Sequence, residues 1–210
     1  AADAEDRGAR LVEAVGVSGT VAEALETTLR RFRLAEGADE ADEERELRRA
    51  ERAATETLAT EGYFSPTLRF AQNDATAAPD VARYRLLVET GPLTRVAAVQ
   101  IEFRGALDEA AFAARAAGLR DDWLLPAGSA FRSPDWEAAK ARLVQATSAR
   151  DFAGAVLVSS QADVDAPAAT ANLKVVVDSG PAYRIGELKI EGLARFDGSP
   201  KIWPRFATTV

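Results

Sequence analysis

The sequence contains no histidine, no cysteine and no methionine among its 210 residues. Without a thiolate or an imidazole, a thiol nucleophile, a Ser-His-Asp triad, a disulfide framework and a Cys/His zinc site are all excluded. We therefore expect no catalytic residue, no metal site and no bound cofactor. A carboxylate-based hydrolase is the one enzyme class left as an alternative, because Asp and Glu together number 33. Nothing in the sequence brings two of these carboxylates together in a cleft, as such chemistry requires.

Clustered positive charge and long apolar runs are also missing. The net charge is −7, which argues against nucleic acid as a partner, since phosphates favour clustered Lys and Arg. No stretch approaches the roughly 18 apolar residues that cross a bilayer, and no apolar core of a signal peptide is present. A chain without Met lacks an initiating residue, so we expect a processed or excised part of a longer protein. An alanine at position 1 suits the mature side of a signal cleavage site.

An internal repeat organises the chain. Residues 84–92 and 173–181 align without a gap at an offset of 89, and the offset persists at Ile101 and Ile190. Tyr63-Phe64 also aligns with Asp151-Phe152 to within one residue. Self-similarity at a fixed period indicates tandem copies of one structural unit. The repeat predicts a first module over residues 1–92, a second over 93–182 and the first strand of a truncated third over 183–210.

Alternating apolar residues predict the strands of each copy. Period-two alternation covers residues 84–89, 99–103, 173–178 and 188–191 and is typical of half-buried strands. Residues 9–15 are predicted as the opening strand of the first copy. Gly91-Pro92 and Gly180-Pro181 follow the closing strands, where Pro cannot donate to a ladder, and are predicted as inter-module linkers.

Helical spacing occupies the middle of each copy. In the first copy Thr20 and Glu23 are predicted to form a capping box, and a second helix is expected to end at Gly62. In the second copy Asp108 is predicted to cap one helix, and Ser133-Pro134 to begin the next. The second helix of each copy is predicted to have an apolar inward face. Its residues are Leu47, Ala50, Ala54 and Leu58 in the first copy and Trp136, Ala139, Leu143 and Ala146 in the second. The predicted fold class is α+β, in β-α-α-β-β order, with two helices packed on a three-stranded mixed sheet.

Three stretches carry a family resemblance. They are Glu61-Gly62-Tyr63-Phe64-Ser65-Pro66, then Gly128 and Phe131 leading into Trp136-Glu137-Ala138-Ala139-Lys140, and residues 178–186 leading into Leu188-Lys189-Ile190-Glu191-Gly192. Their order and spacing resemble POTRA domains, the periplasmic modules of Omp85-type outer-membrane assembly proteins, and the TamA branch in particular. The second copy departs from the pattern, because Arg150-Asp151-Phe152 stands where the family commonly shows Gly-Tyr-Phe.

This resemblance implies a cellular role. The chain would be the periplasmic part of an outer-membrane protein in a Gram-negative bacterium, with its own C-terminal β-barrel absent from this sequence. Its partners would be a TamB-like protein anchored in the inner membrane and unfolded outer-membrane protein clients, without nucleic acid or cofactor. The alternative is a spacer that sets domain geometry in a related protein, either a BamA-like assembly factor or a two-partner secretion transporter.

The candidate binding residues lie on sheet edges. If the last strand of each module is central, the strand before it has one unpaired side, which can accept an extended segment of another chain. The predicted edge residues are Thr67, Leu68, Arg69 and Phe70 in the first copy and Ala155, Val156, Leu157 and Val158 in the second. The aromatic residues Tyr63, Phe64, Phe152 and Trp136 are interpreted as core anchors. The charge run over residues 39–52 is interpreted as a solvated helix face, with a docking patch as the alternative.

Overall fold

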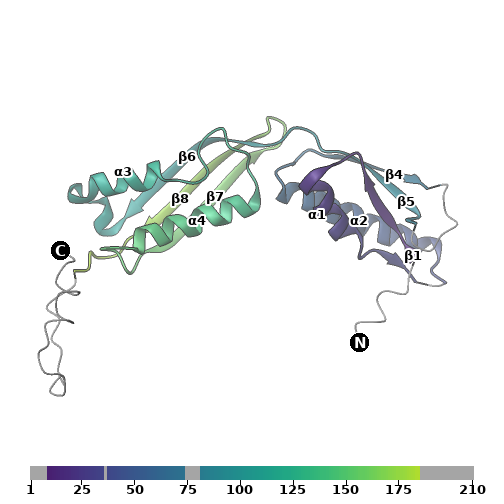
Figure 1. The fold of residues 1–210 in the computed structure, drawn as a ribbon, viewed down its shortest axis with the longest axis horizontal. Coiled ribbons are helices and arrows are strands. Elements are labelled where there is room, and N and C mark those ends of the chain that lie inside the picture. The colour runs from purple at the N-terminus through teal and green to yellow at the C-terminus, as the bar shows by residue number, and fades with distance from the viewer. Residues whose placement is uncertain (1–8, 36, 74–80, 185–210) are drawn as a thin grey trace, which may run out of the picture.

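A computed structural model describes residues 9–35, 37–73 and 81–184 of the chain. Two modules follow one another along the long axis of the molecule (Figure 1). Each has two α-helices and a three-stranded mixed sheet, with strand orders β2-β5-β4 and β6-β8-β7. The predicted α+β class and the β-α-α-β-β order are confirmed. The third module, predicted over residues 183–210, lies outside the described part of the chain apart from Tyr183 and Arg184.

The first module runs from β1 to β5. Its elements are β1 (Ala9–Arg10), β2 (Val12–Val15), α1 (Gly19–Leu29), β3 (Arg33–Leu34), α2 (Glu40–Thr60), β4 (Thr67–Gln72) and β5 (Tyr84–Glu89). β5 is central, parallel to β2 and antiparallel to β4. The single strand predicted over residues 9–15 is in fact two, because β1 pairs with β3 while β2 pairs with β5. Leu11 lies between them, and its N–H donates to the carbonyl of Phe32.

The core of the first module joins α1, α2 and one face of the sheet. Three of the four residues predicted for the inward face of α2, Ala50, Ala54 and Leu58, are buried, and Leu47 is half-buried. In β5, Leu86 and Val88 are buried while Leu87 between them is exposed, as the alternation predicts. Tyr84, at the start of β5, donates a hydrogen bond to Glu43 of α2. That carboxylate raises the pKa of the Tyr84 phenol and connects the sheet to the helix.

Helix capping in the first module differs from the prediction. α1 begins at Gly19 with Ser18 as its N-cap, and this residue makes no side-chain capping bond. The predicted capping box at Thr20 and Glu23 is wrong, because the earlier start places Thr20 within the helix. α2 does have a capping box, formed by Asp39 and Asp42. Its first turn is acidic, and exposed ion pairs follow between Arg45 and Asp42, Arg48 and Glu44, and Arg49 and Glu46.

The second module runs from β6 to β8. Its elements are β6 (Arg95–Arg104), the 3-10 turns η1 (Gly105–Asp108) and η2 (Ala110–Phe112), α3 (Ala113–Asp121), α4 (Ser133–Ser148), β7 (Val156–Asp165) and β8 (Thr170–Asp178). The predicted N-cap at Asp108 is wrong, since this residue ends η1 and α3 begins only at Ala113. The first N–H groups of η1 are already taken, because Ala106 and Leu107 donate to Gly180 and Ser179. The chain therefore docks on the end of β8 before a helix can start.

The helix α4 and the strand β8 supply much of the second core. Trp136, Ala139 and Leu143 are buried as predicted, while Ala146 is half-buried and Thr147 occupies the last fully buried position of the helix. Thr147 satisfies its hydroxyl by donating to the carbonyl of Leu143. Within the described residues only Ala169 combines a positive φ with a side chain, so α4 ends without a left-handed residue, as expected from the missing Gly.

The repeat has a direct counterpart in the structure. β5 and residues 173–178 of β8 are both central strands, 89 residues apart. Gly91 and Gly180 follow them with φ of 70° and 63°.

In the described part of the chain, no helix is both long and apolar enough to cross a membrane.

The capping difference gives a test of the fold. Replacing Asp39 with Ala removes the side-chain acceptor of the Asp42 N–H, and we expect a loss of about 1 kcal/mol in unfolding free energy. Urea unfolding followed by circular dichroism measures the change. Thr20→Ala is the matched control and should cost nothing, since Thr20 caps no helix and Ala is the better helix former. A larger cost for Thr20→Ala than for Asp39→Ala would contradict the observed helix starts.

Candidate functional site

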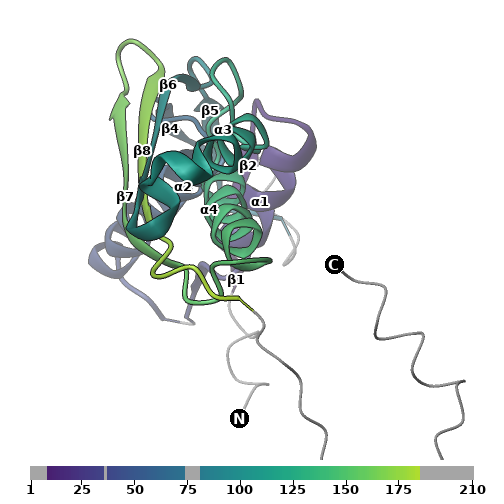
Figure 2. The ribbon, with the colours of Figure 1, turned by 90° about the vertical axis from the view of Figure 1, so that its left-hand side faces the viewer.

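The two sheets leave β4 and β7 as outer strands, as predicted. The central strands β5 and β8 are paired on both sides, whereas β4 pairs only with β5 and β7 only with β8. Figure 2 shows β7 at the outer margin of the second sheet. An outer strand presents unpaired backbone N–H and C=O groups along its free side. Strand edges are therefore the surfaces where this fold offers main-chain hydrogen bonds to another chain.

The strand β7 is the longer and more exposed of the two predicted edges. It has ten residues, and most of its side chains are exposed on both faces of the sheet. Its first three residues form an apolar run, in which Val156, Leu157 and Val158 are 56%, 38% and 46% exposed. Within the described residues, the backbone of 156–164 makes no hydrogen bond outside its ladder with β8. Its outer side is therefore available to another strand.

A register shift divides β7 into two parts. Leu157 lies opposite Val177 and Ser159 opposite Val176, so Val158 has no residue facing it on β8. From Ser159 to Asp165 the pairing is continuous, and Ala162 and Val164 turn inward against the core. The predicted edge residues end at Val158 and therefore cover only the first part of β7. The alternation of Ala162 and Val164 with Gln161, Asp163 and Asp165 was a sequence signal for the full strand.

One of the predicted edge residues lies outside the strand. Ala155 precedes β7 in a turn, where its N–H donates to the carbonyl of Phe152. Phe152 is fully buried and contacts Phe112 edge to ring, with 5.0 Å between the ring centroids. This anchor fixes where β7 emerges from the core. The prediction for Ala155 is therefore wrong, because the turn uses its backbone donor locally.

The edge of β4 is shorter and more mixed in character. Thr67 and Arg69 are exposed, while Leu68 and Phe70 point toward the first core and are half-buried. Phe70 contacts Tyr84 of β5 edge to ring, at 6.4 Å between centroids. Because its apolar side chains face inward, β4 offers a partner mainly backbone groups and polar side chains.

The opposite edge of the second sheet is partly covered. The N–H of Val96 in β6 donates to Ser129, and the N–H of Gly128 donates back to Val96. The guanidinium of Arg120 donates to the carbonyl of Ile101, 3.2 Å away. A loop and a long side chain thus use backbone groups of β6 that another strand would need. Of the two edges of this sheet, β7 is the more accessible.

The two modules contact each other directly at the end of α2. Gly62 has φ of +96°, its carbonyl accepts from the N–H of Thr94, and a Cβ at this residue would lie 2.4 Å from the carbonyl oxygen of Phe131. Glu61 forms an ion pair with Arg132 at 2.5 Å, and Glu61 is the more buried partner. No side chain fits at Gly62 without moving the backbone of the other module.

Aromatic stacking and a hairpin turn extend this junction. The rings of Phe64 and Phe131 are stacked with centroids 6.1 Å apart, and Phe64 packs against the core of the second module. Phe64 thus packs on a core, as predicted, but on that of the second module, whereas Tyr63, which is 89 residues before Phe152, packs on the first core. The Ser65 hydroxyl also donates to Ala166, in the turn between β7 and β8.

The predicted linker residues lie between and after the sheets. Gly91 and Pro92 connect β5 to β6, and a Cβ at Gly91 would lie 2.7 Å from the Ser65 carbonyl oxygen. Gly180 and Pro181 follow β8, and the Gly180 carbonyl accepts from the N–H of Ala106. Their role in setting inter-module angles stays a prediction. Sequence reasoning missed Glu61, Phe131 and Arg132 as junction residues, because they come from segments with no shared pattern.

The described residues contain no cluster of three or more acidic, His or Cys side chains that could hold a metal ion. The candidate site is a binding surface made of backbone edges, chiefly β7.

No model of a known protein family matches the sequence, and no curated protein matches it. Among solved structures, POTRA domains 3–5 of BamA from Haemophilus influenzae align with 88% of this chain and 71% of theirs, at 19% identity and a TM-score of 0.43. POTRA domains 1–3 of Omp85 from Anabaena align with 81% of this chain and 65% of theirs, at 12% identity and a TM-score of 0.38. BamA from Haemophilus ducreyi lacking POTRA domains 1–3 aligns over 81% of this chain but only 29% of its own, at 16% identity and a TM-score of 0.39.

The ion pair at the junction can be tested without disturbing either core. Because the chain has no cysteine, spin labels at Thr55→Cys in α2 and Gln145→Cys in α4 report one inter-module distance. We expect Arg132→Ala to broaden the distance distribution measured by electron spin resonance. A double-mutant cycle with Glu61→Ala should give a coupling energy of about 1 kcal/mol. Lys140→Ala, which breaks a pair inside α4, serves as control. An unchanged distribution for Arg132→Ala would mean that other contacts hold the junction.

Proposed function

We propose that this chain is a periplasmic POTRA scaffold of an Omp85-type outer-membrane protein, similar to TamA. In this role it binds extended segments of other proteins by strand addition at β7. Its partners would be unfolded outer-membrane protein clients, a TamB-like protein of the inner membrane, and its own C-terminal β-barrel. The single observation that carries the proposal is the ten-residue outer strand β7, whose free side is unpaired and whose first residues are apolar and exposed.

The length of β7 suits a client strand. A transmembrane β-strand has about 9–11 residues, and β7 has ten. Strand addition uses main-chain hydrogen bonds, which every sequence can form, while side-chain contacts add selectivity. Along residues 159–165 the ladder is continuous, so a bound strand would meet a regular row of backbone groups. The neighbouring run of Val156, Leu157 and Val158 would contact the alternate apolar side chains of a barrel strand.

The alternative is that the modules act as a spacer in a BamA-like assembly factor or a two-partner secretion transporter. The junction supports this alternative, because Glu61, Gly62 and Phe64 hold the second module by an ion pair, a backbone hydrogen bond and ring stacking. A spacer requires such a junction but does not require an accessible edge. The two proposals therefore differ in whether β7 binds anything.

Site-specific photo-crosslinking separates these functions. A photoreactive residue placed at Leu157 or Ser159 should crosslink to a urea-unfolded outer-membrane β-barrel protein diluted into the sample. The same residue at Thr67 and Arg69 tests the edge of β4, where we expect weaker crosslinking because the exposed side chains there are polar. A matched control is Leu87, which is 42% exposed but lies on the central strand β5, where no backbone edge is free. Equal crosslinking at Leu87 and Leu157 would argue against strand addition.

A charged variant of the edge gives the complementary test. Lys on an edge strand disfavours pairing with another strand. The double variant Val156→Lys and Val158→Lys should weaken client binding at least about tenfold, while its urea unfolding free energy changes by no more than ~0.5 kcal/mol because both side chains are exposed. Leu87→Lys should bind clients as the natural chain does. If the double variant also binds clients normally, the spacer function is favoured.

A further inference from the structure

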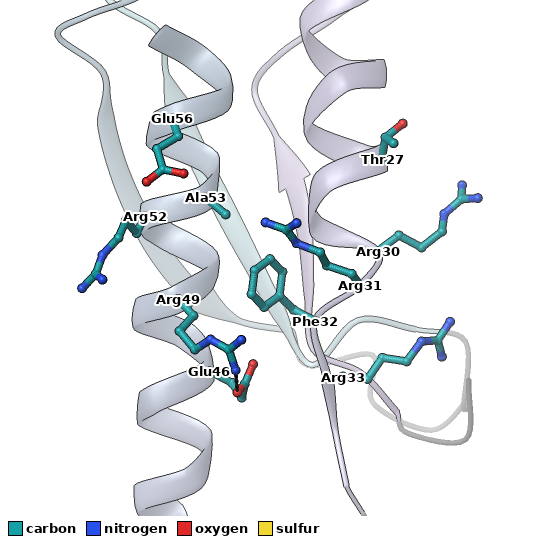
Figure 3. Close-up of a pocket in the computed structure, with 10 residues that line it drawn as sticks. All are labelled: Thr27, Arg30, Arg31, Phe32, Arg33, Glu46, Arg49, Arg52, Ala53 and Glu56. Carbon is teal, nitrogen blue, oxygen red and sulfur yellow. Dashed lines mark hydrogen bonds and ion pairs between the residues drawn. The ribbon is translucent and has the colours of Figure 1, made fainter. Parts of the chain in front are cut away.

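A basic groove crosses the helix layer of the first module. It lies between the end of α1 with its following loop and the middle of α2, and has a volume of about 940 Å³ (Figure 3). Five arginines line it: Arg30, Arg31, Arg33, Arg49 and Arg52. Only two carboxylates, Glu46 and Glu56, accompany them. The groove is thus a positive site on a chain whose net charge is −7.

The arginines come from two separate parts of the sequence. Arg30, Arg31 and Arg33 lie next to Phe32 in the chain after α1, whereas Arg49 and Arg52 belong to α2. Figure 3 shows Arg31 and Arg49 extending from the two walls into the space between the helices. Phe32 is buried, at 6% exposure, and forms the floor with Ala53. The packing of α1 on α2 therefore creates a positive site that neither segment has alone.

Several of these arginines are exposed, and their ion pairs within the described residues are few. Arg49 pairs with Glu46 at 2.6 Å, and Arg30 lies 3.6 Å from Glu26; both arginines are 68% exposed. The guanidinium of Arg31 lies 5.1 Å from the centroid of the Phe32 ring. Within the described residues, neither Arg31 nor Arg52 forms an ion pair. An exposed pair such as Arg49–Glu46 contributes little to stability, so a ligand carboxylate can replace it at small cost.

We propose that this groove docks an acidic polypeptide segment of a partner protein, through carboxylates that pair with Arg31, Arg49 and Arg52. The planar guanidinium fork matches a carboxylate with two parallel hydrogen bonds. In an extended segment, alternate residues face the same way about 6.6 Å apart, so acidic residues at every second position place a row of carboxylates on one face. The groove volume of about 940 Å³ leaves space for such a segment.

The shape and composition of the groove favour a peptide over a membrane surface. Membrane-binding surfaces combine basic residues with exposed apolar side chains that enter the lipid. Here the aromatic residue of the groove is buried beneath the arginines. The large apolar side chains that the described part of the first module exposes, Val15 and Leu87, belong to the sheet. A concave, arginine-lined groove without apolar anchors suits the carboxylates of a peptide.

The test uses a synthetic peptide of roughly eight residues in which Glu alternates with Ser, labelled with a fluorophore. The same peptide with Gln in place of Glu is the ligand control. Anisotropy titrations compare the natural chain with the double variant Arg31→Gln and Arg52→Gln. The matched control is Arg45→Gln and Arg48→Gln, which makes the same change in net charge on exposed arginines outside the groove. All variants are checked by circular dichroism, and we expect folding to be retained because these side chains are exposed.

We expect the groove variant to raise the Kd of the Glu peptide about tenfold and the control variant to change it less than about twofold. Equal weakening in both variants, or equal affinity for the Gln peptide, overturns the proposal. Stronger arginine-dependent binding to phosphatidylglycerol vesicles than to the peptide would assign the groove to a membrane surface instead. Concentration-dependent dimerisation that the groove variant abolishes would make the acidic α2 of a second copy the occupant. The β7 variant Val156→Lys and Val158→Lys should still bind the Glu peptide, so this proposal stands or falls separately from strand addition.

Discussion

The main sheet of each module has three strands, and only its central strand is paired on both sides. The helices cover one face of the sheet, so neither helix closes the strand edges. Each module therefore has two strand edges, whose backbone groups are either covered by nearby residues or left exposed. In the second module a loop and Arg120 take up backbone groups of β6, while β7 is left with a free side. The functional surface proposed at β7 follows from this constraint of small sheets.

The inter-module junction shows how one backbone position can serve two modules. Gly62 ends α2 in the left-handed region, accepts a hydrogen bond from Thr94, and leaves no space for a side chain beside Phe131. Glu61 and Phe64 on either side of it add the ion pair and the ring contact. The orientation of the two modules thus depends on the few residues that connect α2 to β4. The same short segment thus joins the end of α2 to the edge strand β4.

Periodic features could be predicted from the sequence. The alternation in residues 84–89 and 173–178, the face of α2 with Ala50, Ala54 and Leu58, and the start of α4 near Ser133 all appear in the structure. Local helix starts were harder to predict, because α1 begins at Gly19 rather than after Thr20, and α3 begins at Ala113 rather than after Asp108. Asp108 cannot cap α3 when the preceding turn is docked on Ser179 and Gly180. The junction and the basic groove could not be predicted, since Arg132 meets Glu61, and Arg31 meets Arg49, only after folding.

The hydrogen bond between Ser65 and Ala166 has a mechanical consequence. It joins the turn of the β7–β8 hairpin to the first module, so the hairpin is held at the end where it changes direction. Tension on a chain lying along β7 would act parallel to the strands. The ladder between Ser159 and Asp165 would then share the force across all of its hydrogen bonds in shear. A hairpin arranged in this way resists pulling along its length far better than peeling from one end.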